Sequence, residues 1–263
     1  MTASDERLRL RGTFNRIADV YARVRPTYPP AMFDDLADLT GLRPGGRVLE
    51  IGCGTGQASL PLAERGYQLV AVELGPRLAE LAAARLAAHP SATVVVADFD
   101  HWTPDRAGFE VIFSSTAFHW LDPATRYQRT ADLLAPGGWL AVAGTRHVMG
   151  GTERFFVDVQ SCYRRYYPGP SDPPPRADEL PHGTDLGTGG RYREPVVRRY
   201  EWDVEYDTAA YLALLSTYST TLELSPPTAA SLLRDIGRLI DGRYGGRVTK
   251  RYLVELRVAK RAD

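Results

Sequence analysis

Residues 47–57 read Arg-Val-Leu-Glu-Ile-Gly-Cys-Gly-Thr-Gly-Gln and join an apolar stretch to a run of glycines. The first five of these residues predict a short buried strand, and the segment after the glycines, through Glu64, predicts a helix. Glycines at such a turn let a ligand approach the backbone closely, and the helix N-terminus behind them offers unpaired N–H groups. This unit therefore predicts a ligand site at the edge of an α/β sheet.

The spacing of the glycines discriminates between cofactors. A dinucleotide-binding turn has the pattern G-x-G-x-x-G, whereas Gly52, Gly54 and Gly56 follow G-x-G-x-G. The acidic Glu50 just before the turn disfavours a pyrophosphate and suits a positively charged group of a ligand. Glu73, at the end of the next expected strand, is placed to accept hydrogen bonds from ribose hydroxyls.

Short apolar strands alternate with helices through the first half of the chain, which favours a parallel sheet covered on both faces. We expect strands at 68–72, 93–97, 111–114 and 139–143, a turn at 136–138, and helices over 5–24, 31–40, 76–89 and 122–134. The second half predicts helices over 152–167, 208–220 and 226–243, strands at 196–206 and 247–260, and a Pro/Gly-rich loop at 168–195. That loop is either a lid or a mobile connection.

Composition excludes several function classes. Apolar residues make up 44% and charged residues 24% of the 263 residues, as in ordinary globular proteins. The 32 basic residues balance the 32 acidic ones, which disfavours a nucleic-acid or membrane partner. Two cysteines are too few for a disulfide framework, and no metal site is expected. The charged N-terminus and the lack of an apolar run of about 20 residues lead us to expect a cytoplasmic protein.

The glycine turn lies in a longer resemblance to a known family. VLEIGCGTGQ (48–57) resembles the first motif of class I S-adenosylmethionine-dependent methyltransferases, and VAVELGPRLAELA (70–82), ADFDHW (97–102), FSSTAFHWLD (113–122) and LLAPGGWLAV (133–142) continue it in order. The leader FNRIADVYARVRPTYP (14–29) and the tail RYLVELRVAK (251–260) are similar to the small-molecule group that includes trans-aconitate-type methyltransferases.

This resemblance implies an α/β fold: a doubly wound, Rossmann-like sheet of seven mostly parallel strands with an antiparallel last strand, plus a small helical cap. Residues 1–45 would close over the cofactor, 46–150 would form the cofactor-binding core, 151–245 the cap and substrate region, and 246–263 the last strand. The cofactor would be S-adenosyl-L-methionine, with S-adenosyl-L-homocysteine as its product.

The resemblance also implies roles for particular side chains. Glycines of the turn would hold the methionine part of the cofactor, Glu73 its ribose, and Leu74, Asp98 and Phe99 its adenine. Arg25 is a candidate partner for the cofactor carboxylate, because its fork of N–H groups suits that geometry. The implied cofactor-binding set is Tyr21, Arg25, Tyr28, Glu50, Gly52, Cys53, Gly54, Thr55, Gly56, Gln57, Glu73, Leu74, Asp98, Phe99, Ser115 and Thr116.

The acceptor region carries fewer signals. His119 follows the fourth expected strand at the sheet edge where ligands bind, and a reference pKa of about 6.5 suits it as a base. Alternatively, His119 and Trp120 only form a wall that orients the substrate. With His147 and Tyr218 they make up the expected substrate-binding residues.

The activity that the resemblance implies is methylation of a small molecule, most readily at oxygen of a carboxylate or hydroxyl. N- or C-methylation and a nicotinamide-dependent oxidoreductase are the alternatives, and the oligomeric state stays open.

Overall fold

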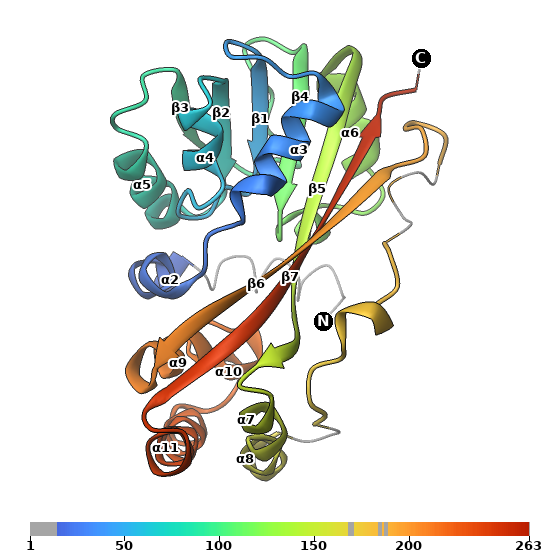
Figure 1. Ribbon diagram of the computed structural model, residues 1–263. Helices are drawn as coiled ribbons and strands as arrows, with labels where there is room; N and C mark the ends of the chain where they lie inside the picture. Colours follow the sequence, from blue (N-terminus) through green and yellow to red (C-terminus); the bar gives the residue numbers. More distant parts are fainter. Residues whose placement is uncertain (1–14, 168–170, 184–185, 187–188, 263) are drawn as a thin grey trace.

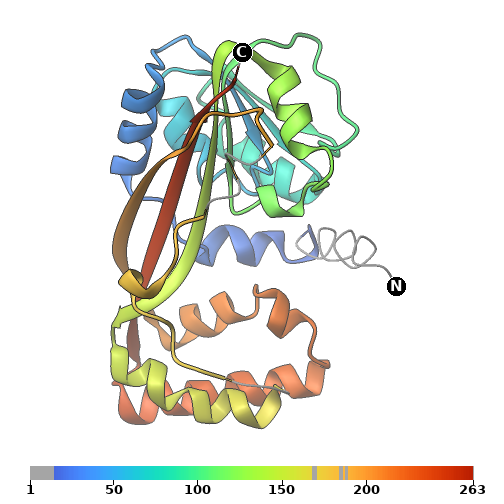
Figure 2. The same ribbon diagram turned by 90° about the vertical axis from the view of Figure 1, so that its right-hand side faces the viewer.

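The structure is a computed structural model that describes residues 15–167, 171–183, 186 and 189–262. A seven-stranded sheet forms one half of the molecule, and a layer of helices lies at the far end of its longest strands (Figure 1 and Figure 2). Helix α2 (Ala18–Val24) lies between these two halves (Figure 2). Most of the helix expected over 5–24 lies outside the described residues.

The strands follow the order β3-β2-β1-β4-β5-β7-β6 across the sheet. Neighbours among the first five are parallel, whereas β7 runs antiparallel to both β5 and β6. The expected doubly wound sheet with an antiparallel last strand is therefore confirmed. The strands are β1 (Arg47–Ile51), β2 (Gln68–Glu73), β3 (Ala92–Val96), β4 (Phe109–Ser115), β5 (Leu134–Gly151), β6 (Val196–Asp207) and β7 (Arg247–Lys260).

Helices cover both faces of the parallel strands because neighbouring strand residues point to opposite faces. Val48 belongs to the apolar core on one face and Leu49 to the core on the other. Helices α3 (Pro30–Thr40), α4 (Ser59–Glu64) and α5 (Pro76–Arg85) contribute to the first core, and α6 (Arg126–Leu133) contributes to the second.

A third apolar core holds the helical cap together. Its centre includes Phe155, Tyr211, Leu232 and Ile236, and it extends to Val248 on β7. The cap helices are α7 (Glu153–Asp158), α8 (Gln160–Tyr166), α9 (Thr208–Leu215), α10 (Ser219–Leu222) and α11 (Pro226–Arg243). The long strands β5, β6 and β7 connect this cap to the sheet (Figure 1).

The fifth strand differs most from its prediction. The expected turn at 136–138 is wrong, because β5 includes those residues, and the strand continues past Ala143 to Gly151. Its extension pairs with β7, with Thr145 opposite Val254 and His147 opposite Tyr252. Cross-strand hydrogen bonds thus keep this segment extended.

Several helices are shorter than predicted. α6 begins at Arg126 because the Asp122 carboxylate accepts the Ala124 N–H and closes a turn there. The helix expected over 208–220 breaks after Leu215, where the side chains of Ser216 and Thr217 donate to nearby carbonyls and so compete with helix continuation.

Helix α5 ends at Arg85 instead of 89, and the helix expected over 152–167 is divided at Val159. No helix in the described part of the chain has the length and hydrophobicity that a membrane span requires.

Candidate active site

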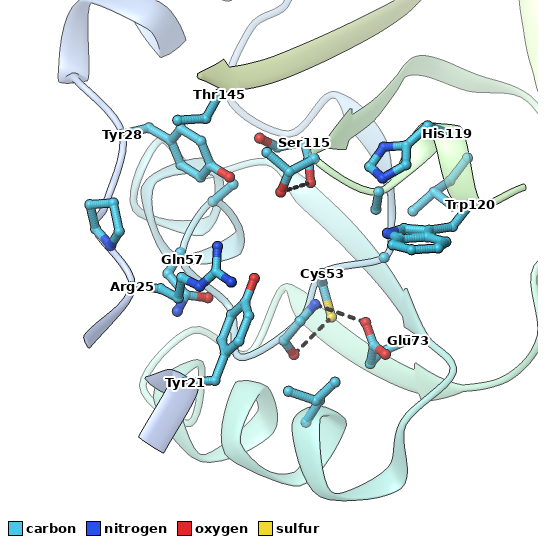
Figure 3. Close-up of a pocket in the computed structure, with 18 of the residues that line it drawn as sticks. Tyr21, Arg25, Tyr28, Cys53, Gln57, Glu73, Ser115, His119, Trp120 and Thr145 are labelled. Carbon is cyan, nitrogen blue, oxygen red and sulfur yellow. Dashed lines mark hydrogen bonds between the residues drawn. The ribbon is translucent and has the colours of Figure 1, made fainter. Parts of the chain in front are cut away.

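A cavity of about 590 Å³ opens where the C-terminal ends of β1, β2 and β4 meet α2 and the cap. Small-molecule sites typically have volumes of about 300–1,000 Å³. The cavity collects the sequence-predicted site residues, from Tyr21 and Arg25 to His147 and Tyr218, except Thr55, Gly56 and Asp98. Figure 3 draws 18 of the lining residues and labels ten, and the labelled side chains converge on one space from several segments of the chain.

The glycine turn presents bare backbone to the cavity. Gly52 and Gly54 have φ of +70° and +58°, a region that side-chain-bearing residues rarely adopt. A Cβ on Gly52 would lie 2.4 Å from the Cβ of Ala117, so the turn and the β4 loop pack too closely for any side chain. A Cβ on Gly54 would meet only the Gln57 amide oxygen, at 4.0 Å, and would otherwise face open space.

Glu73 ties this turn to the end of β2. One carboxylate oxygen accepts the Gly54 N–H at 2.9 Å, and the other accepts the Gly75 N–H at 2.8 Å. The side chain lines the cavity and is 8% exposed. Glu73 therefore orders the turn and also lines the cavity.

We expect Glu73→Ala to weaken S-adenosylhomocysteine binding by about 1–3 kcal/mol, the usual contribution of hydrogen bonds to a charged group. The variant also leaves two turn amides without their acceptor, so its melting temperature is expected to fall. Calorimetric titration measures the affinity, with Glu64→Gln, an exposed substitution on α4, as the control. An unchanged affinity in Glu73→Ala would refute the ribose assignment.

Glu50 is the most deeply buried acid at the cavity. It is 2% exposed, and the Ser59 hydroxyl donates to its carboxylate at 2.5 Å. Burial raises the pKa of Glu50 to about 7, Ser59 opposes this shift, and the nearby Glu73 adds to it. A cationic ligand group beside Glu50 would lower this pKa again, because a nearby positive charge favours the ionised carboxylate.

The segment after α2 forms one wall. The Arg25 guanidinium lies between two rings, 4.8 Å from the ring centre of Tyr21 and 4.7 Å from that of Tyr218. It also donates to the side chain and the carbonyl of Thr217. Arg25 thus fastens the N-terminal segment to the cap, directly at the cavity.

The corner after β4 faces this wall. In Figure 3 the Tyr28 phenol points toward Ser115. Burial raises the pKa of Tyr28, and Ser115 and Thr116 oppose the shift. Thr116 has a φ of +53°, whereas every other non-glycine residue in the described ranges has a negative φ. Strain of this kind costs about 1–3 kcal/mol and is concentrated at functional sites.

Three expected cofactor residues lie outside the lining. Thr55 is fully buried and donates to Gln57 behind the turn. Gly56 packs against Ala82 of α5. Asp98 accepts the Asp100 N–H and lies 3.2 Å from the His101 ring nitrogen. Leu74 and Phe99, by contrast, do line the cavity.

Two histidines line the cavity, and burial lowers the pKa of both. Burial, with a smaller contribution from Arg126, lowers the pKa of His119. Burial and the Lys250 ammonium lower the pKa of His147 to about 2. Such a weakly basic imidazole cannot take up a proton at neutral pH, which leaves His147 as a polar wall residue.

Sequence reasoning missed several lining residues of the long strands. It ended the fifth strand at Ala143 and so left out those of β5, and no motif singled out those of β6 and β7. Lys250 is the most informative of these, since it is 4% exposed and donates to the Tyr218 hydroxyl at 2.8 Å. The sequence did contain a pattern that indicates burial of Lys250. This lysine lies at every-second-residue spacing with Val248, Tyr252 and Val254, on the buried face of β7. The missed lining residues of these strands are Thr145, Arg146, Trp202, Lys250 and Tyr252.

Buried polar atoms without hydrogen-bond partners mark both ends of the cavity. They include the Gln57 amide nitrogen near the glycine turn, and the Thr145 hydroxyl and His147 Nε2 on β5. Buried polar groups are nearly always paired, so these atoms indicate a polar ligand or ordered water. No cluster of three metal-ligating side chains occurs among the described residues.

Comparison with known proteins agrees with this geometry. Residues 48–138 match a family described as a methyltransferase domain. An uncharacterised methyltransferase of Mycobacterium tuberculosis is 32% identical over 130 residues, which are 49% of this chain and 51% of the relative. A trans-aconitate 2-methyltransferase of Methylobacterium radiotolerans is 37% identical over 115 residues, 43% of each chain. The match thus spans about half the length of these curated relatives.

Solved structures extend the likeness to the whole fold. A structure assigned as a type II methyltransferase from Anaeromyxobacter dehalogenans has a TM-score of 0.63 and 25% identity, and the match covers 90% of this chain and 97% of that one. A phosphoethanolamine N-methyltransferase of Haemonchus contortus, solved with S-adenosylhomocysteine, has a TM-score of 0.54 and 16% identity. The match covers 100% of this chain and 61% of that one.

Together, the fold and the comparisons place this chain among proteins with a Rossmann-like methyltransferase fold. Residues 48–138 are the part that matches the methyltransferase-domain family. The cofactor that the sequence resemblance implies is S-adenosylmethionine. The residues present fit the cofactor, because a bare glycine backbone, two buried carboxylates and an unpartnered amide meet in one cavity.

Proposed function

We propose that this protein is an S-adenosylmethionine-dependent methyltransferase that acts on a small molecule, at oxygen of a hydroxyl or carboxylate. The observation that carries the proposal is the continuity of the cavity. Its acidic end, at Glu50 and Glu73, joins an end lined by Arg146, His147 and Lys250. The trans-aconitate 2-methyltransferases among the relatives support a small acceptor.

The acidic end of the cavity would hold the cofactor, and the other end would hold the acceptor. Glu50 would face the cationic amino group of the cofactor, Glu73 its ribose, and Leu74 and Phe99 its adenine. When bound, the cofactor supplies an electrophilic methyl group on sulfonium sulfur. The protein's task is to align the acceptor with that methyl group and to exclude water.

Alignment falls to the corner between β4 and the cap. Ser115 ends β4 and Thr116 follows it. His119 and Trp120 lie on the next turn, with their ring centres 4.8 Å apart. In Figure 3 these rings lie on the opposite side of the site from Tyr21 and Arg25. An acceptor between the two walls would be enclosed by protein, which shields the transfer from water.

Transfer of labelled methyl tests the proposal. Purified protein is incubated with methyl-labelled S-adenosylmethionine and a panel of small carboxylic acids, alcohols, phenols and amines, and products are then treated with alkali. Label released as methanol identifies a carboxyl ester, and stable label on an alcohol or phenol identifies an ether. Label on nitrogen or carbon would refute O-methylation, and no transfer despite S-adenosylhomocysteine binding would refute the acceptor classes.

We expect His119→Ala to raise KM several-fold and to change kcat by less than about tenfold. Burial and Arg126 lower the pKa of His119, which makes its imidazole a weaker base, so we expect the side chain to orient the acceptor instead. Steady-state kinetics separates the roles, because loss of a base lowers kcat whereas loss of uniform binding raises KM. His89→Ala, away from the cavity lining, is the control. A loss of about 100-fold in kcat would instead make His119 the base.

A further inference from the structure

A buried lysine opens onto the acceptor end of the cavity. The Lys250 ammonium donates to the Tyr218 hydroxyl at 2.8 Å, and it lies 5.0 Å from the ring centre of Tyr218 and 5.1 Å from that of Tyr252. It forms no ion pair with a carboxylate within the described ranges of the chain. A buried charge without a counter-charge is costly, so a negative charge is needed beside this ammonium.

Tyr218 is the protein's own source of that charge. Its hydroxyl oxygen accepts a hydrogen bond from Lys250. The neighbouring Tyr252 hydroxyl shares a hydrogen bond of 2.9 Å with the Tyr206 hydroxyl. The Arg25 guanidinium covers the Tyr218 ring. The hydrogen bond from Lys250 and the two nearby cations thus stabilise a phenolate at this oxygen.

The other ionisable groups around Tyr218 do not oppose this. Burial disfavours ionisation of Tyr218, but Lys250 and Arg25 outweigh it and lower the pKa of the phenol. The titratable and charged groups that face Tyr218 are Lys250 and Tyr252 on β7, Tyr21 on α2, Arg25 after α2, Tyr163 on α8, Tyr206 on β6 and Tyr211 on α9.

Tyr218 is also close to the cofactor end. Arg25 lies between its ring and the ring of Tyr21, and all three side chains line the cavity. The break between α9 and α10, where Thr217 holds Arg25, presents Tyr218 to the cavity. The phenol is therefore a nearby proton acceptor for an acceptor molecule bound between cap and sheet.

We propose that Tyr218, held by Lys250, is the base that takes the proton from a hydroxyl group of the acceptor. This inference rests on the proposed methyl transfer. The acceptor O–H proton passes to the Tyr218 oxygen, and the acceptor oxygen bonds to the methyl carbon. The carbon–sulfur bond breaks with its electron pair left on sulfur, and Tyr218 later gives its proton to water. The acceptor is thus an alcohol or phenol, because a carboxylic acid is already ionised at neutral pH.

The first test needs no acceptor. Tyrosinate ultraviolet absorbance is followed during a pH titration of the full-length protein. We expect the tyrosine that ionises first in the wild type to be absent from Tyr218→Phe and to ionise at higher pH in Lys250→Met. Tyr166→Phe, on α8 but outside the cavity lining and hydrogen-bonded to Asp235, should leave that first step unchanged. Persistence of the step in Tyr218→Phe would overturn the proposal.

The second test uses the acceptor found with labelled methyl. Tyr218→Phe should lose about 100-fold or more in kcat, with KM within a few-fold of the wild type. Lys250→Met should shift the acid limb of the pH–rate profile to higher pH. Full kcat in Tyr218→Phe, or a methyl ester as the product, would overturn the proposal.

Binding of S-adenosylhomocysteine keeps the two claims separate. Melting scans with and without it are run on the wild type and on Tyr218→Phe, which also report folding of the variant. A wild type that neither binds S-adenosylhomocysteine nor transfers methyl refutes the proposed function itself. A wild type that binds and transfers, beside an equally active Tyr218→Phe, refutes only the role of Tyr218.

Discussion

A Gly54→Val variant is expected to fold and to lose detectable binding of S-adenosylhomocysteine. The added side chain meets open space at the cavity, so the isopropyl group would occupy the volume that the methionine part of the cofactor needs. At a φ of +58° a β-branched residue is also strained, by about 1–3 kcal/mol. Calorimetric titration measures binding, and thermal unfolding confirms the fold.

Gly41→Val is the matched control for this variant. Gly41 ends α3 with a φ of +71°, has no atom within 4 Å of an added Cβ, and does not line the cavity. It should show similar backbone strain and wild-type binding. Wild-type affinity in Gly54→Val would contradict the close approach of ligand to this turn.

A Glu50→Gln variant is expected to become more stable above pH 7 while it binds the cofactor more weakly. Burial holds the pKa of Glu50 at about 7 against an ordinary 4.5, so the folded protein binds this proton more tightly than the unfolded chain. The contribution of Glu50 to the free energy of unfolding is fully present below pH 4.5. As the pH rises to 7, about 3 kcal/mol of that contribution is lost. Glutamine removes this loss and can still accept from Ser59.

Binding should change in the opposite direction. The ionised carboxylate would face the cofactor ammonium, so glutamine is expected to weaken S-adenosylhomocysteine binding by about 1–3 kcal/mol. Denaturant unfolding at pH 5 and pH 8, together with calorimetric titration, measures both effects, with Glu64→Gln as the control. A variant less stable than the wild type at pH 8, or one with unchanged affinity, would contradict the role of Glu50.

Local rules made the glycine-turn end of the cavity predictable. The strand at 47–51, the glycines and Glu73 follow one another along the chain as strand, turn and next strand end, so their periodicity and order place them at one sheet edge. The structure accordingly brings Gly54 and Glu73 within hydrogen-bond distance. Thr55, Gly56 and Asp98 are the exceptions, since none of them lines the cavity. The Asp98 carboxylate instead contacts its own turn and His101.

The acceptor half depends on contacts that are distant in sequence. Lys250 meets Tyr218 only because β7 pairs with both β5 and β6 and carries the cap on its far end. No local periodicity reports such pairing. Likewise, Tyr218 is exposed to the cavity because Ser216 and Thr217 interrupt the helix, where the apolar pattern predicted continuation to 220.

Thermal unfolding with S-adenosylhomocysteine tests the central claim most directly, because it depends on the cavity and not on the identity of the acceptor. A ligand that binds only the folded state at about 100 times its Kd adds about 2.7 kcal/mol of stability. We predict that S-adenosylhomocysteine and S-adenosylmethionine raise the melting temperature of the wild type and that NAD and NADH leave it unchanged. In Gly54→Val, none of these ligands should change the melting temperature. A rise with a nicotinamide dinucleotide and none with S-adenosylhomocysteine would contradict the account.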